Sequence, residues 1–338
     1  MRRGPGRLRG WGGAAGMAVA CAVTAAVTLV PLSLCAGPPG GGAGPETDRT
    51  GGTGVVRAAP AAAAECDDSR PDESLRPSGE DGATIEAIRK RAEKNGEEPK
   101  LVVGVDQNSY RWGYRNPATG ELEGFDIDLA REIADRILGD PDDVVFRAIP
   151  TNQRIPALQA GRVDMIVRTM TISCERKAEG VEFSTAYFRA GQQVLAPKSS
   201  PVKGYDETLN GKRVCAAAGS TAESALMEKS FGSKIIRVDN QLDCLVRLQL
   251  GQVDAVVTDN ALAAGQAAQD PSVELKGDAF TTEYYGVAVK KGSDDLVRRI
   301  NQVLEDYRES KWSRAYDKWL KADMGEDPGP PDARYRDN

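Results

Sequence analysis

The chain has 338 residues, of which 28% are charged and 40% hydrophobic, so it is long enough for one large or two modest globular domains. Histidine is absent, which excludes Ser-His-Asp and Cys-His nucleophilic machinery, zinc sites with histidine ligands and the usual general base at neutral pH. The formal net charge is −6, and a chain that begins at Cys35 carries −10, because the four arginines of residues 1–34 are then removed. An overall negative field argues against a nucleic-acid partner.

The N-terminus predicts export from the cytoplasm. Residues 1–10 are basic, and residues 14–34 form an uncharged, largely apolar stretch before Cys35, a pattern typical of an export signal. Leu32-Ser33-Leu34-Cys35 is similar to a lipoprotein signal, so we expect residues 1–34 to be the signal segment and Cys35 to be lipidated. Cys21 is a weaker candidate for lipidation. An uncleaved signal anchor is the alternative, because the stretch is about long enough to span a bilayer.

Four cysteines follow the signal segment: Cys66, Cys174, Cys215 and Cys244. An even number of cysteines in an oxidising compartment predicts two disulfides, for which three pairings are possible. We favour Cys215–Cys244, because both fall in one predicted lobe, and Cys66–Cys174, which would tie the N-terminal segment to the other lobe. A zinc site is the rival interpretation, but the chain has no Cys-x-x-Cys pair and we expect no metal.

Composition and hydrophobic periodicity divide the rest of the chain. Residues 35–83, rich in Gly, Ala and Pro over 36–62, are predicted to be a flexible tether, and residues 326–338 a disordered tail. Ordered structure is expected to start near Ala83. A buried strand at 101–106, a turn after Asn116 between two hairpin arms, and an amphipathic helix that stops at Gly139 then follow in order.

An internal sequence repeat indicates two similar lobes. Residues 158–167 read LQAGRVDMIV, and residues 248–257 read LQLGQVDAVV. Each segment reads as the end of an apolar-striped helix, a glycine able to adopt the left-handed conformation, and a strand entered through Val-Asp. Two lobes of α/β build are therefore predicted.

Ligands of open α/β sheets bind outside the carboxyl ends of the strands. There the first lobe presents Arg176 and Thr171, which can hold a carboxylate, and the second presents Asp259, which can accept hydrogen bonds from an ammonium. This polarity suits a free α-amino acid. The alternative is that Arg176 and Asp259 only pair with neighbours on the surface.

A second anion-binding element is expected in the later lobe. Ser220-x-x-Glu223 matches a capping box at the start of a helix. The free N–H groups around Ser220 and Thr221 are a natural site for a carboxylate.

Several sequence blocks in order resemble family 3 solute-binding proteins of polar amino-acid ABC importers, over about residues 98–322. The blocks are LVVGVD, GELEGFDIDLAREIA, RIPALQAGRVDMIV, TMTISCERKAEGVEFSTAYF, GKRVCAAAGSTAE, LQLGQVDAVVTDNA, YYGVAVKKGSDDL and WSRAYDKWL. The SCER and RVCAAAGST blocks look most like envelope-anchored members specific for glutamate, glutamine, aspartate or asparagine.

The resemblance implies the fold class and the domain boundaries. The fold is α/β, a two-lobe periplasmic-binding-protein clamp of type II joined by two hinge strands. Lobe 1 would comprise residues 84–192 and 286–325, and lobe 2 residues 193–285. The chain would cross between the lobes near 193–195 and near 285–287.

The resemblance also assigns roles at the site. Arg176 would hold the α-carboxylate with Thr171 and with the loop that carries Ser220 and Thr221, and Asp259 would bind the α-ammonium. Asp106 would lie at the mouth of the first strand. Arg154 would approach a side-chain carboxylate, and Arg168, beside Thr169, would either add positive charge or point away from the ligand. The full expected ligand-binding set is Asp106, Arg154, Arg168, Thr169, Thr171, Arg176, Ser220, Thr221 and Asp259.

The expected function is capture of glutamate, aspartate or one of their amides by lobe closure, followed by delivery to a membrane ABC permease. We expect a monomer anchored by lipid to the outer face of the cytoplasmic membrane, without cofactor or catalysis. One alternative is an amino-acid sensor that signals to a membrane protein. A more remote one is a dehydratase-type enzyme that uses Asp106 or Asp259 as acid or base.

Overall fold

The computed structural model describes residues 66–93, 96 and 98–336, and the statements below concern this part of the chain. The predicted signal segment, Cys21 and Cys35 lie outside the described residues. Within the described part, no helix combines the length and the apolar character needed to cross a bilayer.

The first lobe is built on a five-stranded sheet with the order β5-β1-β6-β15-β7. β1 is parallel to its neighbours β5 and β6, whereas β15 is antiparallel to β6 and β7. The strands are β1 (Leu101–Val105), β5 (Val144–Ala148), β6 (Met165–Ile166), β7 (Val181–Phe183) and β15 (Ala288–Lys290). Its helices are α1 (Ala83–Glu93), α2 (Phe125–Leu138), α3 (Arg154–Gln159), α4 (Cys174–Ala178), α8 (Asp294–Ser310) and α9 (Trp312–Trp319). A small sheet β2-β3-β4 comprises Asn108–Ser109, Gly113–Arg115 and Leu122–Glu123.

The second lobe repeats this topology. Its sheet has the order β11-β10-β12-β9-β13, and again one neighbour of the central strand, here β9, runs antiparallel to it. The strands are β9 (Gln192–Pro197), β10 (Arg213–Ala217), β11 (Lys234–Val238), β12 (Ala255–Asp259) and β13 (Val273–Lys276). The helices are α5 (Thr221–Glu228), α6 (Gln241–Gln249) and α7 (Asn260–Gln269), followed much later in the chain by the short α10 (Lys321–Met324). The predicted α/β clamp with two lobes is confirmed.

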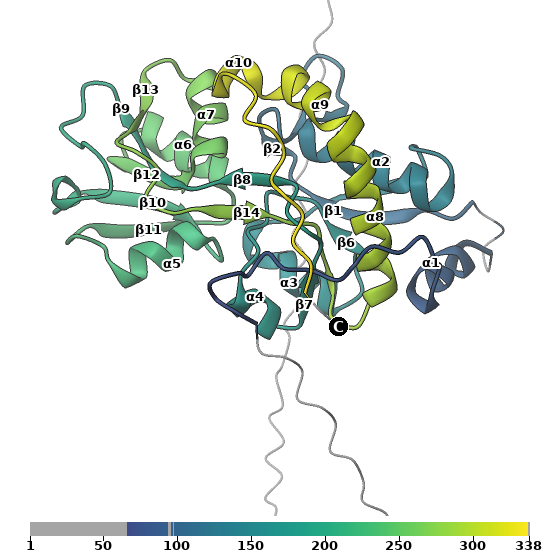
Figure 1. The fold of residues 1–338 in the computed structure, drawn as a ribbon. Helices are drawn as coiled ribbons and strands as arrows, with labels where there is room; N and C mark the ends of the chain where they lie inside the picture. Colours follow the sequence, from purple (N-terminus) through teal and green to yellow (C-terminus); the bar gives the residue numbers. More distant parts are fainter. Residues whose placement is uncertain (1–65, 94–95, 97, 337–338) are drawn as a thin grey trace, which may run out of the picture. The chain divides into compact units, whose positions relative to one another are not determined.

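Two short strands connect the lobes. β8 (Phe188–Ala190) and β14 (Glu283–Tyr285) pair antiparallel, and they run between the two sheets in Figure 1. β8 continues into β9 of lobe 2, and β14 continues into β15 of lobe 1. The first crossing lies a few residues before the expected 193–195, because β9 already pairs with β12 over that range. At the end of β8, Gly191 allows close approach of the other connection, since a Cβ there would lie 2.1 Å from the Thr281 carbonyl oxygen.

The repeated LQxGxVD segments form the same unit in each lobe. α3 and α6 end in these segments, and Gly161 and Gly251 follow with φ of 64° and 65°. Only a residue without Cβ adopts this left-handed conformation at little cost. The chain then enters β6 and β12, the central strands of the two sheets. The sequence repeat therefore corresponds to a repeated helix–glycine–strand unit in the structure.

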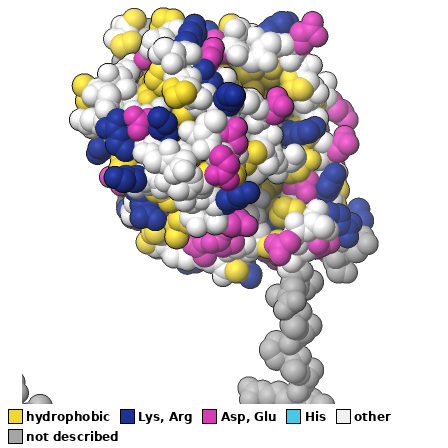
Figure 2. All heavy atoms as spheres, turned by 90° about the vertical axis from the view of Figure 1, so that its left-hand side faces the viewer, with side chains coloured by type: hydrophobic (Ala, Val, Ile, Leu, Met, Phe, Trp, Pro, Cys, Tyr) yellow, Lys and Arg dark blue, Asp and Glu magenta, His cyan; other side chains and the backbone are white. Residues whose placement is uncertain are grey.

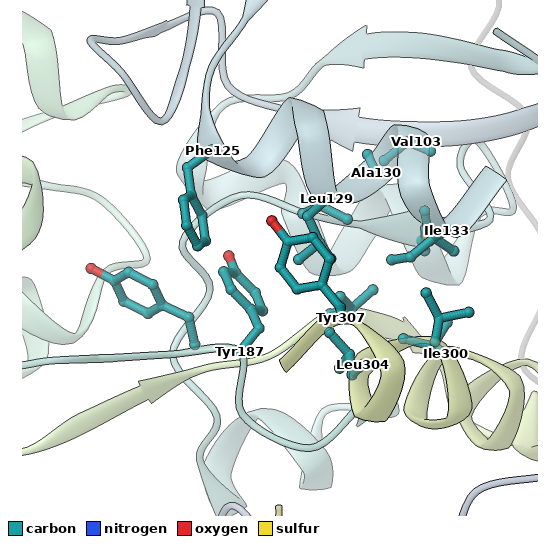
Figure 3. Close-up of a cluster of buried hydrophobic side chains, with 14 of the residues drawn as sticks. Val103, Phe125, Leu129, Ala130, Ile133, Tyr187, Ile300, Leu304 and Tyr307 are labelled. Atoms are coloured by element: carbon teal, nitrogen blue, oxygen red, sulfur yellow. The ribbon is translucent and has the colours of Figure 1, made fainter. Parts of the chain in front are cut away.

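The core of lobe 1 forms where α2 lies between β1 and α8. Figure 3 shows Phe125, Leu129 and Ile133 of α2 facing Ile300, Leu304 and Tyr307 of α8, with Val103 of β1 and Tyr187 alongside. These side chains are nearly all inaccessible to solvent. Burial of each large apolar side chain contributes about 1.5–3 kcal/mol to stability. This layer therefore holds the sheet in place, and the site is built at the carboxyl ends of its strands.

The described part of the chain contains two disulfides, Cys66–Cys174 and Cys215–Cys244. The pairing favoured from the sequence is confirmed. Cys215–Cys244 joins β10 to α6 inside lobe 2, and Cys66–Cys174 attaches the N-terminal segment to α4.

Both ends of the described chain differ from the predicted tether and tail. Residues 66–82 are packed on lobe 1: the Ser74 side chain is fully buried, and its hydroxyl donates to the Phe183 carbonyl (2.6 Å). Residues 326–336 return to the same place, where Tyr335 forms a β-bridge with Ser74 and Arg336 pairs with Glu182 (2.9 Å). The prediction missed the order of these two segments, because polar contacts rather than an apolar stripe hold them.

Asn301 of α8 gives a test of this packing. Its buried amide donates to the Ser74 hydroxyl (2.9 Å) and the Leu75 carbonyl (2.6 Å) and accepts from the Thr185 N–H (2.8 Å). Asn301→Ala leaves several buried groups without partners, each worth about 1–3 kcal/mol. We expect the free energy of unfolding in urea to fall by about 2 kcal/mol or more. Glu309→Ala, at an exposed position of the same helix, is the control; equal stability of the two variants would contradict the assignment.

Candidate functional site

The carboxyl ends of both sheets meet in one cleft. In lobe 1, Thr151 follows β5 and donates its hydroxyl to Gln241 of lobe 2 (3.0 Å). Arg154 and Arg176 of lobe 1 both donate to the Gly219 carbonyl of lobe 2, at 3.1 and 3.2 Å. These bonds place the predicted groups of the two lobes opposite each other, as the strand-end rule requires.

Arg154 and Arg176 form a buried cationic pair. Arg176 is 7% exposed and donates to the Thr171 carbonyl (2.6 Å); Arg154 is 3% exposed and donates to the Thr151 carbonyl (2.9 Å). Burial, followed by the positive charges of Arg176 and Arg168, holds the pKa of Arg154 well below its usual range. In the described part of the chain, neither guanidinium makes an ion pair within 4 Å. Two buried cations that share a neutral carbonyl attract an anion.

Local structure fixes Arg176. α4 begins after Ser173, whose hydroxyl accepts the Arg176 N–H (3.3 Å) as an N-cap. The disulfide of Cys174 to Cys66 attaches the first residue of the same helix to the N-terminal segment. Both restraints limit the positions available to the guanidinium.

The start of α5 faces this pair. Ser220 caps the helix by accepting the Glu223 N–H (3.2 Å), and the Glu223 carboxylate accepts the Gly219 N–H (2.7 Å). Gly219 has φ of 74°, and a Cβ there would lie 3.1 Å from Asn152 Cα of lobe 1. The predicted cap is therefore present, and its glycine lets the lobes approach closely.

Two carboxyl groups form the acidic side of the cleft. Asp259, at the end of β12, accepts from the Gln192 side chain (2.5 Å), and Glu283 of β14 accepts from the hydroxyls of Thr171 (2.6 Å) and Thr221 (2.9 Å). Burial, followed by the negative charge of Glu283, raises the pKa of Asp259 well above its usual value. Asp259 was predicted from the sequence. Glu283 and Gln192 were not, because Glu283 on connecting strand β14 and Gln192 at the start of β9 belong to no motif.

Arg168 and Asp106 pair with each other. Arg168 is fully buried, forms an ion pair with Asp106 (2.8 Å) and donates to the Thr151 hydroxyl (2.9 Å) and to Asn240 of lobe 2 (3.3 Å). The Arg168 charge predicted from the sequence therefore points into the protein, where Asp106 neutralises it.

Thr169 is held through its backbone. It has φ of 40°, and its N–H donates to the Asp126 carboxylate (2.9 Å), which also accepts from the Tyr187 hydroxyl (2.9 Å). Burial is the main cause that raises the pKa of Asp126 to about 7. Asp126 thus supports the loop between β6 and α4 without bordering the cleft charges directly.

A cavity of about 200 Å³ lies between the lobes. Of the predicted residues, Arg154, Arg176, Ser220 and Thr221 border it, together with Thr151, whereas Asp106, Arg168, Thr169, Thr171 and Asp259 do not. A larger cavity of about 540 Å³ lies behind the hinge strands, against the C-terminal segment, and none of the predicted residues borders it. The described residues contain no cluster of three or more acidic or thiol side chains suited to a metal ion.

Comparisons with known proteins agree with this geometry. The family model for bacterial extracellular solute-binding proteins, family 3, matches residues 101–322. The chain belongs to this family. The ABC transporter glutamine-binding protein GlnH of Bacillus subtilis is 41% identical over 67% of this chain and 83% of its own length.

Two solved structures are similar to the family member described here. An ancestral arginine-binding protein bound to glutamine has 38% identity and a TM-score of 0.62, covering 67% of this chain and 98% of that one. A mutant of ArgBP from T. maritima has 32% identity and a TM-score of 0.64, covering 71% of this chain and 100% of that one.

Asp126 makes stability depend on pH. Its pKa is about 7 in the folded protein, against a usual value of 3.8, so the folded state binds the proton more tightly and stability falls as the pH rises from about 4 to about 7. Asp126→Asn removes this loss of stability with rising pH, because an amide does not ionise. The new amide can still form a hydrogen bond with the Tyr187 hydroxyl. Between pH 5 and pH 8 we expect the variant to gain about 2–3 kcal/mol of unfolding free energy relative to wild type.

Urea unfolding at the two pH values measures this gain. Asp278→Asn, at an exposed position of lobe 2, is the control and should follow wild type. An Asp126→Asn variant whose pH profile parallels that of wild type would show that Asp126 is not the titrating group.

Proposed function

We propose that this protein is the extracytoplasmic binding component of an ABC importer, which captures a free polar amino acid by lobe closure and delivers it to a membrane permease. The observation that carries the proposal is the opposition of charges in the cleft. Arg154 and Arg176 offer two buried guanidinium groups, and Asp259 and Glu283 offer two buried carboxyl groups. An α-amino acid carries the complementary carboxylate and ammonium.

Lobe closure follows from the position of these groups. Arg176 comes from lobe 1, Ser220 and Thr221 from lobe 2, so an α-carboxylate would contact both lobes only when they are shut. A ligand that binds the closed form better shifts the population toward it. The hinge strands β8 and β14 provide the two connections about which such a motion turns.

The charges favour a ligand with a neutral side chain. Arg154 and Arg176 match Asp259 and Glu283 in number, and Arg168 is already neutralised by Asp106 (2.8 Å). A glutamate side chain would add a negative charge to a cleft whose two arginines already offset its two acids, whereas a carboxamide adds none. We therefore favour glutamine among the amino acids expected from the sequence; the similarity to a glutamine-binding protein supports this choice.

The surface also fits a role in solute capture. Figure 2 shows Lys and Arg side chains interspersed with Asp and Glu over the face that lobe 2 presents, not a continuous basic surface of the kind that nucleic acid requires. We propose that the protein acts as a monomer without catalysis.

Arg176 is the residue whose loss should abolish capture. Arg176→Ala leaves a desolvated ligand carboxylate without its cation, which weakens binding by about 2–5 kcal/mol. Calorimetry with glutamine measures this loss; a thermal-shift panel of amino acids, in which glutamine should raise Tm most, first verifies the ligand. Arg147→Ala, at an exposed position of β5, is the control. Unchanged affinity of Arg176→Ala would refute the site.

We further propose that Cys35 is acylated and anchors the protein to the outer face of the cytoplasmic membrane. The lipoprotein-like residues 32–35 support this. Cells fed a clickable fatty acid should label the wild-type protein and not Cys35→Ser. Persistent labelling of Cys35→Ser, with loss in Cys21→Ser, would transfer the anchor to the earlier cysteine.

A further inference from the structure

Glu283 occupies a junction between the hinge and both lobes. It lies on hinge strand β14 and is 8% exposed. The same carboxylate oxygen accepts from the hydroxyl of Thr171 in lobe 1 (2.6 Å) and from that of Thr221 in lobe 2 (2.9 Å). Glu283 is thus held in place by both halves of the cleft.

A hydrogen-bonded network connects Glu283 to Asp259. The Gln192 amide donates to Asp259 (2.5 Å) and to the Thr221 hydroxyl (3.0 Å), and Thr221 in turn donates to Glu283. Asp259 is 6% exposed. One network therefore links two buried carboxyl groups that come from different elements.

The groups around this pair come from several elements. Arg176 of α4 and Arg154 of α3 contribute positive charge, and Tyr285 of β14 presents a buried hydroxyl. The two guanidinium groups donate to carbonyl oxygens instead of forming ion pairs with these acids within 4 Å. Two neighbouring carboxylates in a buried site repel each other when both are ionised, so such pairs retain a proton. The raised pKa of Asp259, caused by burial and by the charge of Glu283, agrees with this.

We infer that Glu283 joins Asp259 in a two-carboxyl receptor for the α-ammonium of the ligand, and that the pair holds one proton until the ammonium displaces it. The inference rests on the proposed function, since the ammonium is that of the captured amino acid. On binding, the carboxyl O–H bond breaks and its proton passes to water or buffer. The ammonium keeps its own three protons, which become hydrogen-bond donors to the two carboxylates.

This exchange couples capture to pH. Where Asp259 is protonated in the free protein, each binding event releases one proton, so the Kd rises tenfold for each unit by which the pH falls. Removal of the Glu283 carboxylate ends the repulsion between the two groups, while burial still raises the pKa of Asp259. Glu283→Gln therefore releases less than one proton on binding, and its Kd depends less steeply on pH.

Calorimetry of the protein with glutamine at pH 6.0, in buffers of different ionisation enthalpy, tests this. The slope of observed heat against buffer enthalpy equals the number of protons released. We expect a slope near one for wild type and a clearly smaller slope for Glu283→Gln. Glu274→Gln, which removes a carboxylate of β13 outside the site, should keep the wild-type slope.

Each outcome decides a separate point. Binding with a slope of zero in wild type overturns the proton inference and leaves amino-acid capture intact; this measurement does not depend on the folding of any variant. A full slope in Glu283→Gln overturns the role of Glu283. Absence of both heat and thermal shift with every amino acid overturns the proposed function itself.

Discussion

Charges buried without direct partners at the junction of two sheets dominate this structure. Arg154 and Arg176 share the Gly219 carbonyl, and Asp259 and Glu283 are linked through Gln192 and Thr221. Isolated buried charges are costly, and a ligand that carries both a carboxylate and an ammonium would satisfy both sides of the cleft at once. Binding and lobe closure therefore share one electrostatic origin.

The repeated topology explains how one chain places opposite charges face to face. Each lobe presents the carboxyl ends of three parallel strands, and the fourth strand of each sheet arrives from the hinge in the opposite direction. The two connections therefore lie beside the site. Glu283 shows the consequence, since a residue of a connecting strand contacts hydroxyls of both lobes.

Local sequence patterns predicted the features that depend on neighbours along the chain. The LQxGxVD units, the Ser220 cap and the pairing of cysteines were all anticipated. The partners of Arg168 were not, because its pairing with Asp106 depends on the spatial order of β1 and β6. Glu283 was missed for the same reason. The packing of residues 66–82 and 326–336 was missed because single polar contacts to buried Asn301 and Glu182 leave no periodic pattern in the sequence.

The contact between Ser74 and Tyr335 places both ends of the described chain on lobe 1. Fluorescent proteins fused next to these two segments would therefore both move with lobe 1. The distance between them would change little when the cleft opens. An optical sensor made from this protein needs its second fluorophore inserted in lobe 2, for example in the exposed turn at Pro271 and Ser272.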